Sequence, residues 1–137
     1  MFEVEVRNVG GEAAAIGNAG PHTLVVDRPA DGGGRGLGFN GGELLYLAIA
    51  GCVSNDLFRE ARAVGLRIDR VRVVVRGDFA GDPAVSSDVE YEVEISGGGP
   101  PEQLRALVDQ VDAIAEIPNS LRRGTVVRLG DVHFAAQ

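Results

Sequence analysis

Residues 42–52 read GELLYLAIAGC and end on the single cysteine of a 137-residue chain. They open a predicted helix that runs from about Gly42 to Val64 and that Gly65 ends. The first part of this helix is apolar around its whole circumference, so it must be surrounded by protein. Polar side chains appear from Asn55 onward, where the helix is expected to emerge toward solvent.

Short strands and one further helix are predicted around this apolar helix. Alternating apolar and charged residues predict three strands, at 1–7, 12–16 and 22–27, and a hairpin made of 68–79 and 86–95. An amphipathic helix is predicted over 101–116, with Pro118 as its stop, followed by strands at 125–129 and 132–134. This order, with no internal repeat and no dividing linker, predicts a single α+β domain over residues 1–137 with mostly antiparallel sheet.

The predicted hairpin carries a regular charge pattern. Arginines alternate with valines on its first strand, and acidic residues alternate with apolar ones on its second. Antiparallel pairing sets a basic row beside an acidic row on one face. We interpret this face as a solvated sheet surface and not as a binding patch.

Composition and charge exclude several classes of protein. Hydrophobic residues make up 45% and charged residues 24% of the chain, as in an ordinary globular protein. The net charge of −7 argues against nucleic acid as a partner, because phosphate binding needs a basic face. The longest apolar run is about half the length of a membrane-spanning helix, and the N-terminus does not resemble a signal peptide. With one cysteine and no metal-binding pair of the CxxC or HExxH type, we expect a cytoplasmic protein without metal or cofactor.

A helix that is apolar on all sides needs cover on all sides. One small sheet and one further helix cover about half of it, so a partner subunit is the natural source of the rest. The sequence therefore predicts an obligate homodimer.

Two features other than the cysteine could indicate a binding or catalytic site. Residues 36–41 match the GxGxxG pattern of dinucleotide-binding loops, but the preceding strand ends near Asp27, too far back for a tight strand-to-helix turn, and an antiparallel hairpin follows the helix. A flexible loop is favoured, although its amide groups could still hold an anion. His22 and His133 have no second ligand-type residue at a useful spacing and are interpreted as ordinary strand residues.

Cys52 is the remaining candidate for chemistry. A free cysteine on an apolar helix can pack as a small hydrophobic residue, or it can serve as a nucleophile. It lies about three turns inside the helix, where the helix dipole no longer favours its thiolate. A reactive thiolate there needs a cation from another part of the structure.

Residues 39–52, FNGGELLYLAIAGC, resemble the signature of the OsmC/Ohr family, whose central helix begins with a motif like N-P-x-E-L-L-L-A-A-L-A-G-C. The order of the predicted elements, the glycine-rich loop before the helix and residues 117–121, IPNSL, fit the same family. The resemblance implies an OsmC-like intertwined homodimer with antiparallel sheets around long central helices. It also implies reduction of organic hydroperoxides by a cysteine pair.

Carried over residue by residue, the resemblance makes Cys52 the peroxidatic cysteine. The resolving cysteine is replaced by Ile117, and the glutamate of the enzymatic members is replaced by Gly42; Glu43 matches the more general E-L-L pattern. The activating arginine is absent from its usual segment, which leaves Arg28 and Arg35 as the nearby substitutes.

Two functions follow. The first is a one-cysteine peroxidase for small hydrophobic hydroperoxides, with Cys52 as nucleophile, Arg35 or Arg28 as thiolate stabiliser and Glu43 as orienting group. Because no internal disulfide can form, an external thiol must reduce the oxidised sulfur. The second is a non-catalytic relative that binds a small hydrophobic ligand at the dimer interface, with Cys52 as a packing residue.

Overall fold

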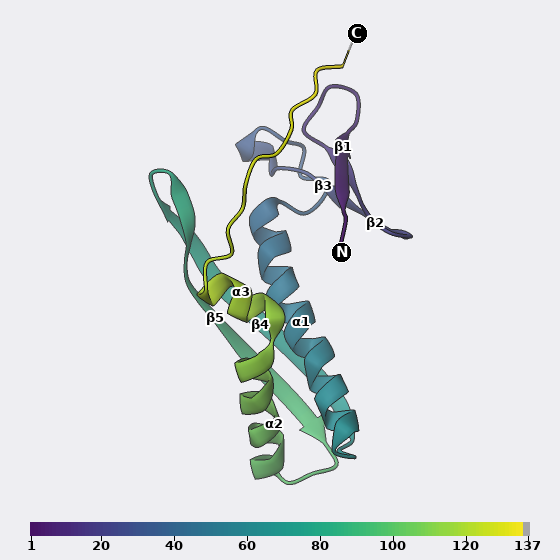
Figure 1. Ribbon diagram of the computed structural model, residues 1–137, viewed down its shortest axis with the longest axis vertical. Coiled ribbons are helices and arrows are strands. Elements are labelled where there is room, and N and C mark those ends of the chain that lie inside the picture. Colours follow the sequence, from purple (N-terminus) through teal and green to yellow (C-terminus); the bar gives the residue numbers. More distant parts are fainter. Residues whose placement is uncertain (136–137) are drawn as a thin grey trace. The chain divides into compact units, whose positions relative to one another are not determined.

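The computed structural model describes residues 1–135, so the last two positions of the expected domain lie outside it. Within this range the chain has the mixed α+β class expected from its sequence, with two antiparallel sheets and three α-helices (Figure 1). The elements are β1 (Glu5–Asn8), β2 (Ala15–Ala19), β3 (His22–Val26), η1 (Ala30–Gly32), α1 (Gly41–Ala63), β4 (Ile68–Gly81), β5 (Ala84–Gly97), α2 (Pro101–Ile114) and α3 (Glu116–Arg122).

The chain divides into two compact units. The first consists of Met1–Gly51 and Val74–Glu92, and the second of Cys52–Val73 and the described residues from Val93 onward. Helix α1 and the β4–β5 hairpin each run through both units. Among residues 1–135, no helix is both long and apolar enough to cross a membrane.

In the first unit, β1, β2 and β3 form an antiparallel sheet in that order. The strands predicted at 1–7 and 12–16 begin later than expected, at Glu5 and Ala15. The connection between them accounts for the later start of β2: Gly10 and Gly11 both take positive φ, and the Val9 amide donates to Ala14 O at 2.9 Å. This turn uses residues that the alternating pattern alone assigns to the second strand.

Helix α1 has well-defined ends. At its start the Glu43 amide donates to Asn40 Oδ1 and the Asn40 amide donates to Glu43 Oε1, both at 2.9 Å, which is a capping box. At its end the Leu66 amide donates to Ala61 O and the Gly65 amide to Arg62 O, with Gly65 at φ 69°. This Schellman motif is the stop that Gly65 predicts.

The core of the second unit lies between the later half of α1 and α2. Val53, Leu57 and Ala61 of α1 are buried, as are Leu107 and Val111 of α2. Gln110 Nε2 of α2 also donates to Glu60 of α1 at 3.1 Å. The amphipathic stripe predicted for the second helix is therefore the face that packs.

The predicted end of the second helix is wrong in detail. Helix α2 stops at Ile114 because Ala115 is extended, and the seven-residue helix α3 then contains Pro118. Pro118 is the third residue of α3, where an amide hydrogen has no acceptor within the helix, so the proline starts this helix and does not stop it.

The two strands predicted at 125–129 and 132–134 are also wrong for this chain. Residues 125–135 contain no helix or strand. Their apolar side chains are open to solvent, with Val127 at 91% and Phe134 at 94% exposed. Since a strand exists only when it pairs with another strand, an alternating sequence without a neighbour stays extended but unpaired.

The charge rows predicted for the hairpin are confirmed. Arg72 pairs with Glu94 at 2.9 Å and Arg76 with Glu92 at 3.1 Å, all with exposed side chains. The hairpin also meets the start of α1: Tyr46 stacks on Phe79 at a centroid distance of 5.8 Å and shares a hydrogen bond of 2.9 Å with Ser86. The paired face is a solvated surface, and Tyr46 fixes the hairpin to α1 in the first unit.

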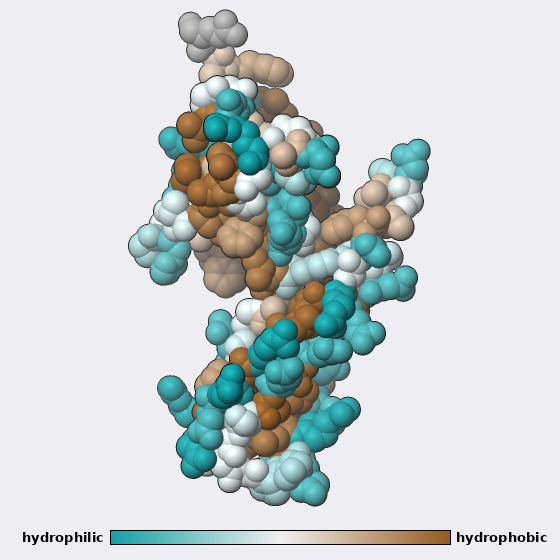
Figure 2. Space-filling model, turned by 180° about the vertical axis from the view of Figure 1, so that it is seen from behind, coloured by the Kyte–Doolittle hydropathy of each residue, from teal (hydrophilic) through white to brown (hydrophobic). Residues whose placement is uncertain are grey.

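Hydrophobic side chains are exposed along α1. Leu47 is 50% and Phe58 is 47% exposed, and with Gly51 and Asn55 they follow one another at spacings of three and four residues. These four positions form one open stripe of the helix. Figure 2 shows hydrophobic residues at the surface among the charged ones. The sequence expectation that α1 needs cover beyond its own chain agrees with this exposure.

Candidate functional site around Cys52

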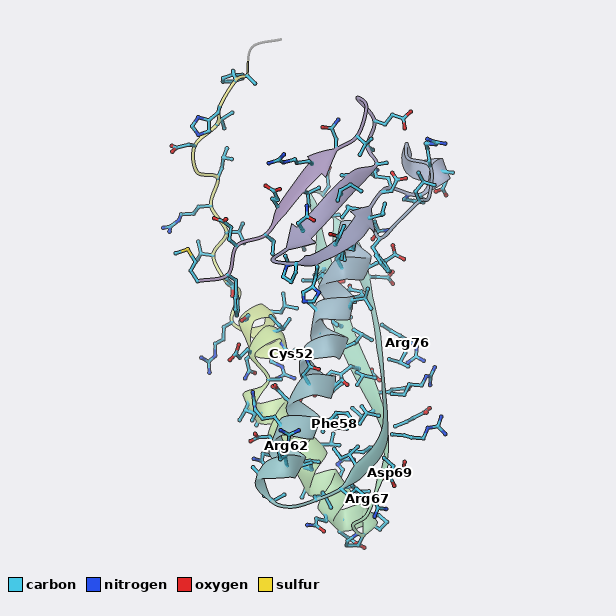
Figure 3. All side chains as sticks on the ribbon, turned by 90° about the vertical axis from the view of Figure 1, so that its right-hand side faces the viewer. Cys52, Phe58, Arg62, Arg67, Asp69 and Arg76 are labelled. Atoms are coloured by element: carbon cyan, nitrogen blue, oxygen red, sulfur yellow. The ribbon has the colours of Figure 1, made fainter. Side chains whose placement is uncertain are left out.

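Cys52 lies midway along α1 and is half-buried (Figure 3). Phe58 and Arg62 follow it on the same helix.

A carboxylate is the polar neighbour of the thiol. Cys52 Sγ donates to Asp56 Oδ2 at 4.0 Å, a long contact between residues one helical turn apart. Asp56 is 8% exposed and is one of two buried charged residues in the described chain. No feature of the sequence analysis pointed to Asp56, although the i, i+4 spacing from Cys52 is its visible signal.

Arg59 compensates the charge of Asp56. Its guanidinium lies 3.2 Å from Asp56 Oδ1 and donates from Nε to Glu60 at 3.1 Å. The hydrogen bond to Glu60, then the charge of Asp56, raises the pKa of Arg59 further above its usual value. Cys52, Asp56 and Arg59 thus form a chain of contacts along one face of α1, which we call the Cys52 network.

Glu43 caps the helix on which Cys52 sits. Its carboxylate accepts the Asn40 amide, so it is part of the capping box. Nine residues separate it from Cys52, which is about 13 Å along a helix. In the described chain Glu43 therefore acts at the N-terminus of α1.

Gly42, at the position of the family's glutamate, is tightly enclosed. A Cβ added there would lie 2.8 Å from the Phe79 ring. The ring is stacked on Tyr46, and Phe79 is 49% exposed. A side chain at position 42 would therefore need the Phe79 ring to shift.

The two candidate arginines lie in the loop before α1. Arg28 donates from Nε to Gly32 O at 2.6 Å, within its own loop. Arg35 reaches Glu12 at 3.5 Å, and both of these side chains are exposed. Of the two guanidinium groups, that of Arg35 is held less tightly.

Asp27 organises this loop, a role that sequence reasoning missed. Its side chain is buried and accepts the backbone amides of Arg28 at 2.8 Å and of Arg35 and Leu37 at 3.1 Å each. The Leu37 amide contributes most to holding the pKa of Asp27 below its usual value, and the other two amides act in the same direction. The available signal was one acidic residue between an apolar strand and a glycine-rich loop.

The GxGxxG-like segment is thereby accounted for. The amides of Leu37 within it and of Arg35 just before it bind the chain's own carboxylate, and the start of α1 is capped by Asn40. The loop that the sequence left open as an anion site already has an internal anion in place.

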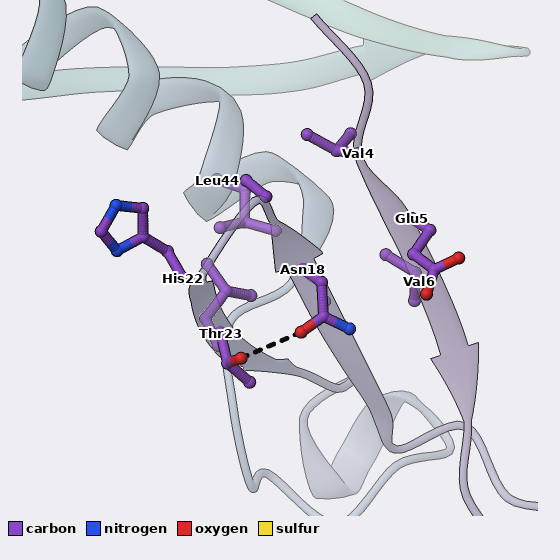
Figure 4. A pocket seen from close by; sticks show the side chains of 10 residues that line it. Val4, Glu5, Val6, Asn18, His22, Thr23 and Leu44 are labelled. Atoms are coloured by element: carbon purple, nitrogen blue, oxygen red, sulfur yellow. Dashed lines mark hydrogen bonds between the residues drawn. The ribbon is translucent and has the colours of Figure 1, made fainter.

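An apolar pocket of about 250 Å³ lies in the first unit. Figure 4 shows Val4 and Val6 of the N-terminal segment, Leu44 of α1, and Asn18, His22 and Thr23 around it. Thr23 Oγ1 donates to Asn18 Oδ1 at 2.9 Å, so these polar groups satisfy each other. The pocket is suited to an apolar molecule or side chain.

The other residues singled out from sequence lie apart from any catalytic cluster. Ile117 is the half-buried second residue of α3, and His133 lies in the exposed segment that follows. No group of three His, Cys, Asp or Glu side chains suited to a metal ion occurs in the described part of the chain.

Comparison with protein families shows which family the chain belongs to. Residues 32–130 match the model of the OsmC-like proteins. The chain belongs to the OsmC-like family. The resemblance of residues 39–52 to the family's helix signature is thereby confirmed. No curated protein matches the chain.

Solved structures share the OsmC-like fold at low sequence identity. An OsmC-like protein from Mycoplasma pneumoniae has a TM-score of 0.77 at 16% identity, with 91% of this chain and 89% of that chain covered. An organic hydroperoxide resistance protein OsmC from Legionella pneumophila has 0.66 at 16%, with 89% of each chain covered. A similar protein from Vibrio cholerae, described with captopril in one of its active sites, has 0.59 at 18%, covering 91% and 85%.

Proposed function

We propose that this OsmC-like chain is a one-cysteine peroxidase that reduces small hydrophobic hydroperoxides. The observation that carries the proposal is the place of Cys52: half-buried on α1, directly after the family motif, and hydrogen-bonded to a charged group. Fold neighbours described as organic hydroperoxide resistance proteins support the same chemistry.

The reaction has two stages. The Cys52 sulfur attacks one oxygen of the hydroperoxide, the O–O bond breaks, and the products are a sulfenic acid and an alcohol. Ile117 offers no thiol, so an external thiol condenses with the sulfenic acid and releases water. A second external thiol then exchanges with this mixed disulfide and restores Cys52.

The protein acts as a homodimer in this proposal. The open stripe on α1 and the unpaired segment 125–135 both present apolar side chains that a second copy would bury. In such a dimer Arg35 is the better candidate for a cation supplied to a neighbouring Cys52, because its bond to Glu12 is long and exposed. Arg28 is the second candidate, and Glu43 acts on the site by holding the start of α1.

The test is a short pulse of cumene hydroperoxide followed by dimedone and mass spectrometry. A dimedone adduct at Cys52 within seconds to minutes is expected, and the Cys52→Ser variant must give none. Arg35→Ala should slow adduct formation more than Arg28→Ala does. A wild-type Cys52 that stays unmodified while a hydroperoxide resistance protein reacts in parallel would falsify the peroxidase.

The apolar pocket favours the second candidate, a binding protein without turnover. It predicts that cumyl alcohol, the unreactive counterpart of the hydroperoxide, binds and shifts the NMR signals of Leu44 and Thr23. Binding together with an unreactive Cys52 would support this candidate. If cumyl alcohol does not bind, the binding-protein candidate is wrong.

A further inference from the structure

Reduction of a hydroperoxide moves a proton as well as an oxygen. A neutral thiol must lose its proton as sulfur attacks, and the departing alkoxide must gain one. The proposed function, on which this inference rests, names no group for that transfer. The Cys52 network contains one.

Asp56 is the group in position to accept the thiol proton. It lies one helical turn after Cys52, with Oδ2 4.0 Å from Sγ, and its side chain is only 11% exposed. If Asp56 is a carboxylate, only the thiol can be the donor in this contact, although the S···O distance of 4.0 Å is long. A catalytic hydrogen bond is often long before substrate binds and shortens in the reacting complex.

Arg59 places a cation beside the buried Asp56. A buried charge without a partner is costly. Arg59 supplies the cation at 3.2 Å from Asp56 Oδ1, the oxygen that does not face the sulfur. One carboxylate oxygen thus binds the arginine while the other remains free for the thiol.

The surroundings hold Arg59 in this orientation. Glu60 accepts from its Nε, Gln110 of α2 binds Glu60, and the charge of Glu116 at the start of α3 acts on the guanidinium as well. These residues, with Asp56, are the charged and polar groups that face Arg59 from its own helix and from the packed helices. The arrangement positions Arg59 from three elements of the second unit.

We propose that Asp56 relays the thiol proton of Cys52 to the departing alkoxide, and that Arg59 is the positioning residue of this relay. As the S–O bond forms and the O–O bond breaks, Asp56 takes the proton from sulfur and passes it to the alkoxide. The alcohol leaves, Cys52 holds the sulfenic acid, and Asp56 returns to its carboxylate form. Atoms and electrons balance with the hydroperoxide as oxidant.

The experiment compares two reactions of the same thiol. Oxidation by cumene hydroperoxide needs a proton for its leaving group, whereas alkylation by iodoacetamide releases iodide and needs none. Asp56→Asn keeps the size of the side chain but cannot carry the proton. We expect it to slow oxidation on the order of 100-fold at pH 7, a typical effect of a general acid–base group. Alkylation also needs the thiol proton removed, so it is expected to slow as well, but clearly less than oxidation, which in addition loses the proton delivered to the alkoxide.

Further variants separate the relay from a structural role. Asp56→Glu should recover part of the oxidation rate, and Arg59→Ala should slow oxidation while Arg59→Lys restores most of it. Asp69→Asn, which removes an exposed carboxylate bound to Arg67 at 2.8 Å, serves as the matched control and should leave both reactions unchanged. Circular dichroism checks that each variant is folded; if Asp56→Asn is not, the two Arg59 variants decide.

The outcomes of the proposed function and of the relay can be told apart. A wild-type Cys52 that does not react with the hydroperoxide overturns the peroxidase and the relay with it. A reactive wild type with an Asp56→Asn variant that oxidises equally fast, or faster, overturns the relay alone. Equal slowing of oxidation and alkylation also overturns it, because a displaced thiol explains that result.

Discussion

Gly42 and Phe79 meet at the start of α1, where a side chain at position 42 would contact the aromatic ring at 2.8 Å. The sequence has glycine where the family resemblance implies a glutamate, but it does not show what lies beside that position. The neighbour is a residue 37 positions later, at the place where the hairpin meets α1 through Tyr46. The observed position of the Phe79 ring is therefore compatible with glycine at position 42 and would have to change for a larger residue.

Asp27 illustrates the same limit at residue scale. Its three amide partners come from a loop in which backbone segments lie very close together. Such close contacts leave no periodic pattern in the sequence. A Cβ on Gly38 would collide with Val25 O, and one on Gly34 with Arg28 O. A side chain at either position would overlap the backbone, and of the two glycines only Gly38 belongs to the GxGxxG pattern of residues 36–41.

The first prediction at this scale concerns pH. The pKa of Asp27 is lowered in the folded chain, so its contribution to stability is present above the unfolded carboxyl pKa and is lost as pH falls through the lower folded value. Asp27→Asn should therefore destabilise the protein at pH 7 and progressively less below about pH 4. Urea unfolding across this range measures the difference. Asp31→Asn, an exposed carboxylate in the same loop, is the control; an equal loss in both variants would contradict the role of Asp27.

Among the elements, α1 was the most predictable from sequence. Its apolar run, the Asn40–Glu43 spacing and Gly65 are local signals, and the helix boundaries agree with the prediction to within one residue. Helix α3 is less predictable from sequence. Pro118 suggests the end of a helix, but the extended Ala115 ends α2, and Pro118 lies in the first turn of the next helix. Local sequence does not distinguish these two uses of proline.

The capping box gives a prediction at element scale. Asn40→Ala removes the acceptor for the Glu43 amide and should cost about 1 kcal/mol of stability. Glu43→Gln can still accept the Asn40 amide and should cost less. Urea unfolding at fixed protein concentration gives both values. If Glu43→Gln slows hydroperoxide reduction strongly while leaving stability intact, Glu43 acts at the reacting sulfur and not only as a cap.

At the scale of the whole molecule, the sequence predicted a partner subunit but did not indicate which residues of α1 are exposed. The apolar residues of 44–53 predicted missing cover for α1, and the open stripe of Leu47, Gly51, Asn55 and Phe58 locates it. Segment 125–135 was predicted as strands because its pattern alternates. A strand pattern specifies a capacity to pair and does not identify the chain that supplies the neighbour.

The prediction at this scale is the state of assembly. Sedimentation velocity at low micromolar concentration should show dimer alone. Phe58→Glu places a charge on the open stripe, and an unpaired buried charge costs about 3 kcal/mol or more, so dissociation should become at least about 100-fold easier. A wild type that sediments as a well-folded monomer, or a Phe58→Glu variant that remains a dimer at the same dilution, would contradict the assignment of this face.

The carboxylate of Asp27 accepts three backbone amides of the loop, as a bound anion would. Removing it by Asp27→Gly would leave three amides directed at an empty space the size of a small anion. Formate or acetate added from solution could then enter and restore the loop, as a small molecule rescues a truncated side chain. A fixed structural element would become one whose folding depends on the anion concentration, and so a starting point for an engineered carboxylate sensor.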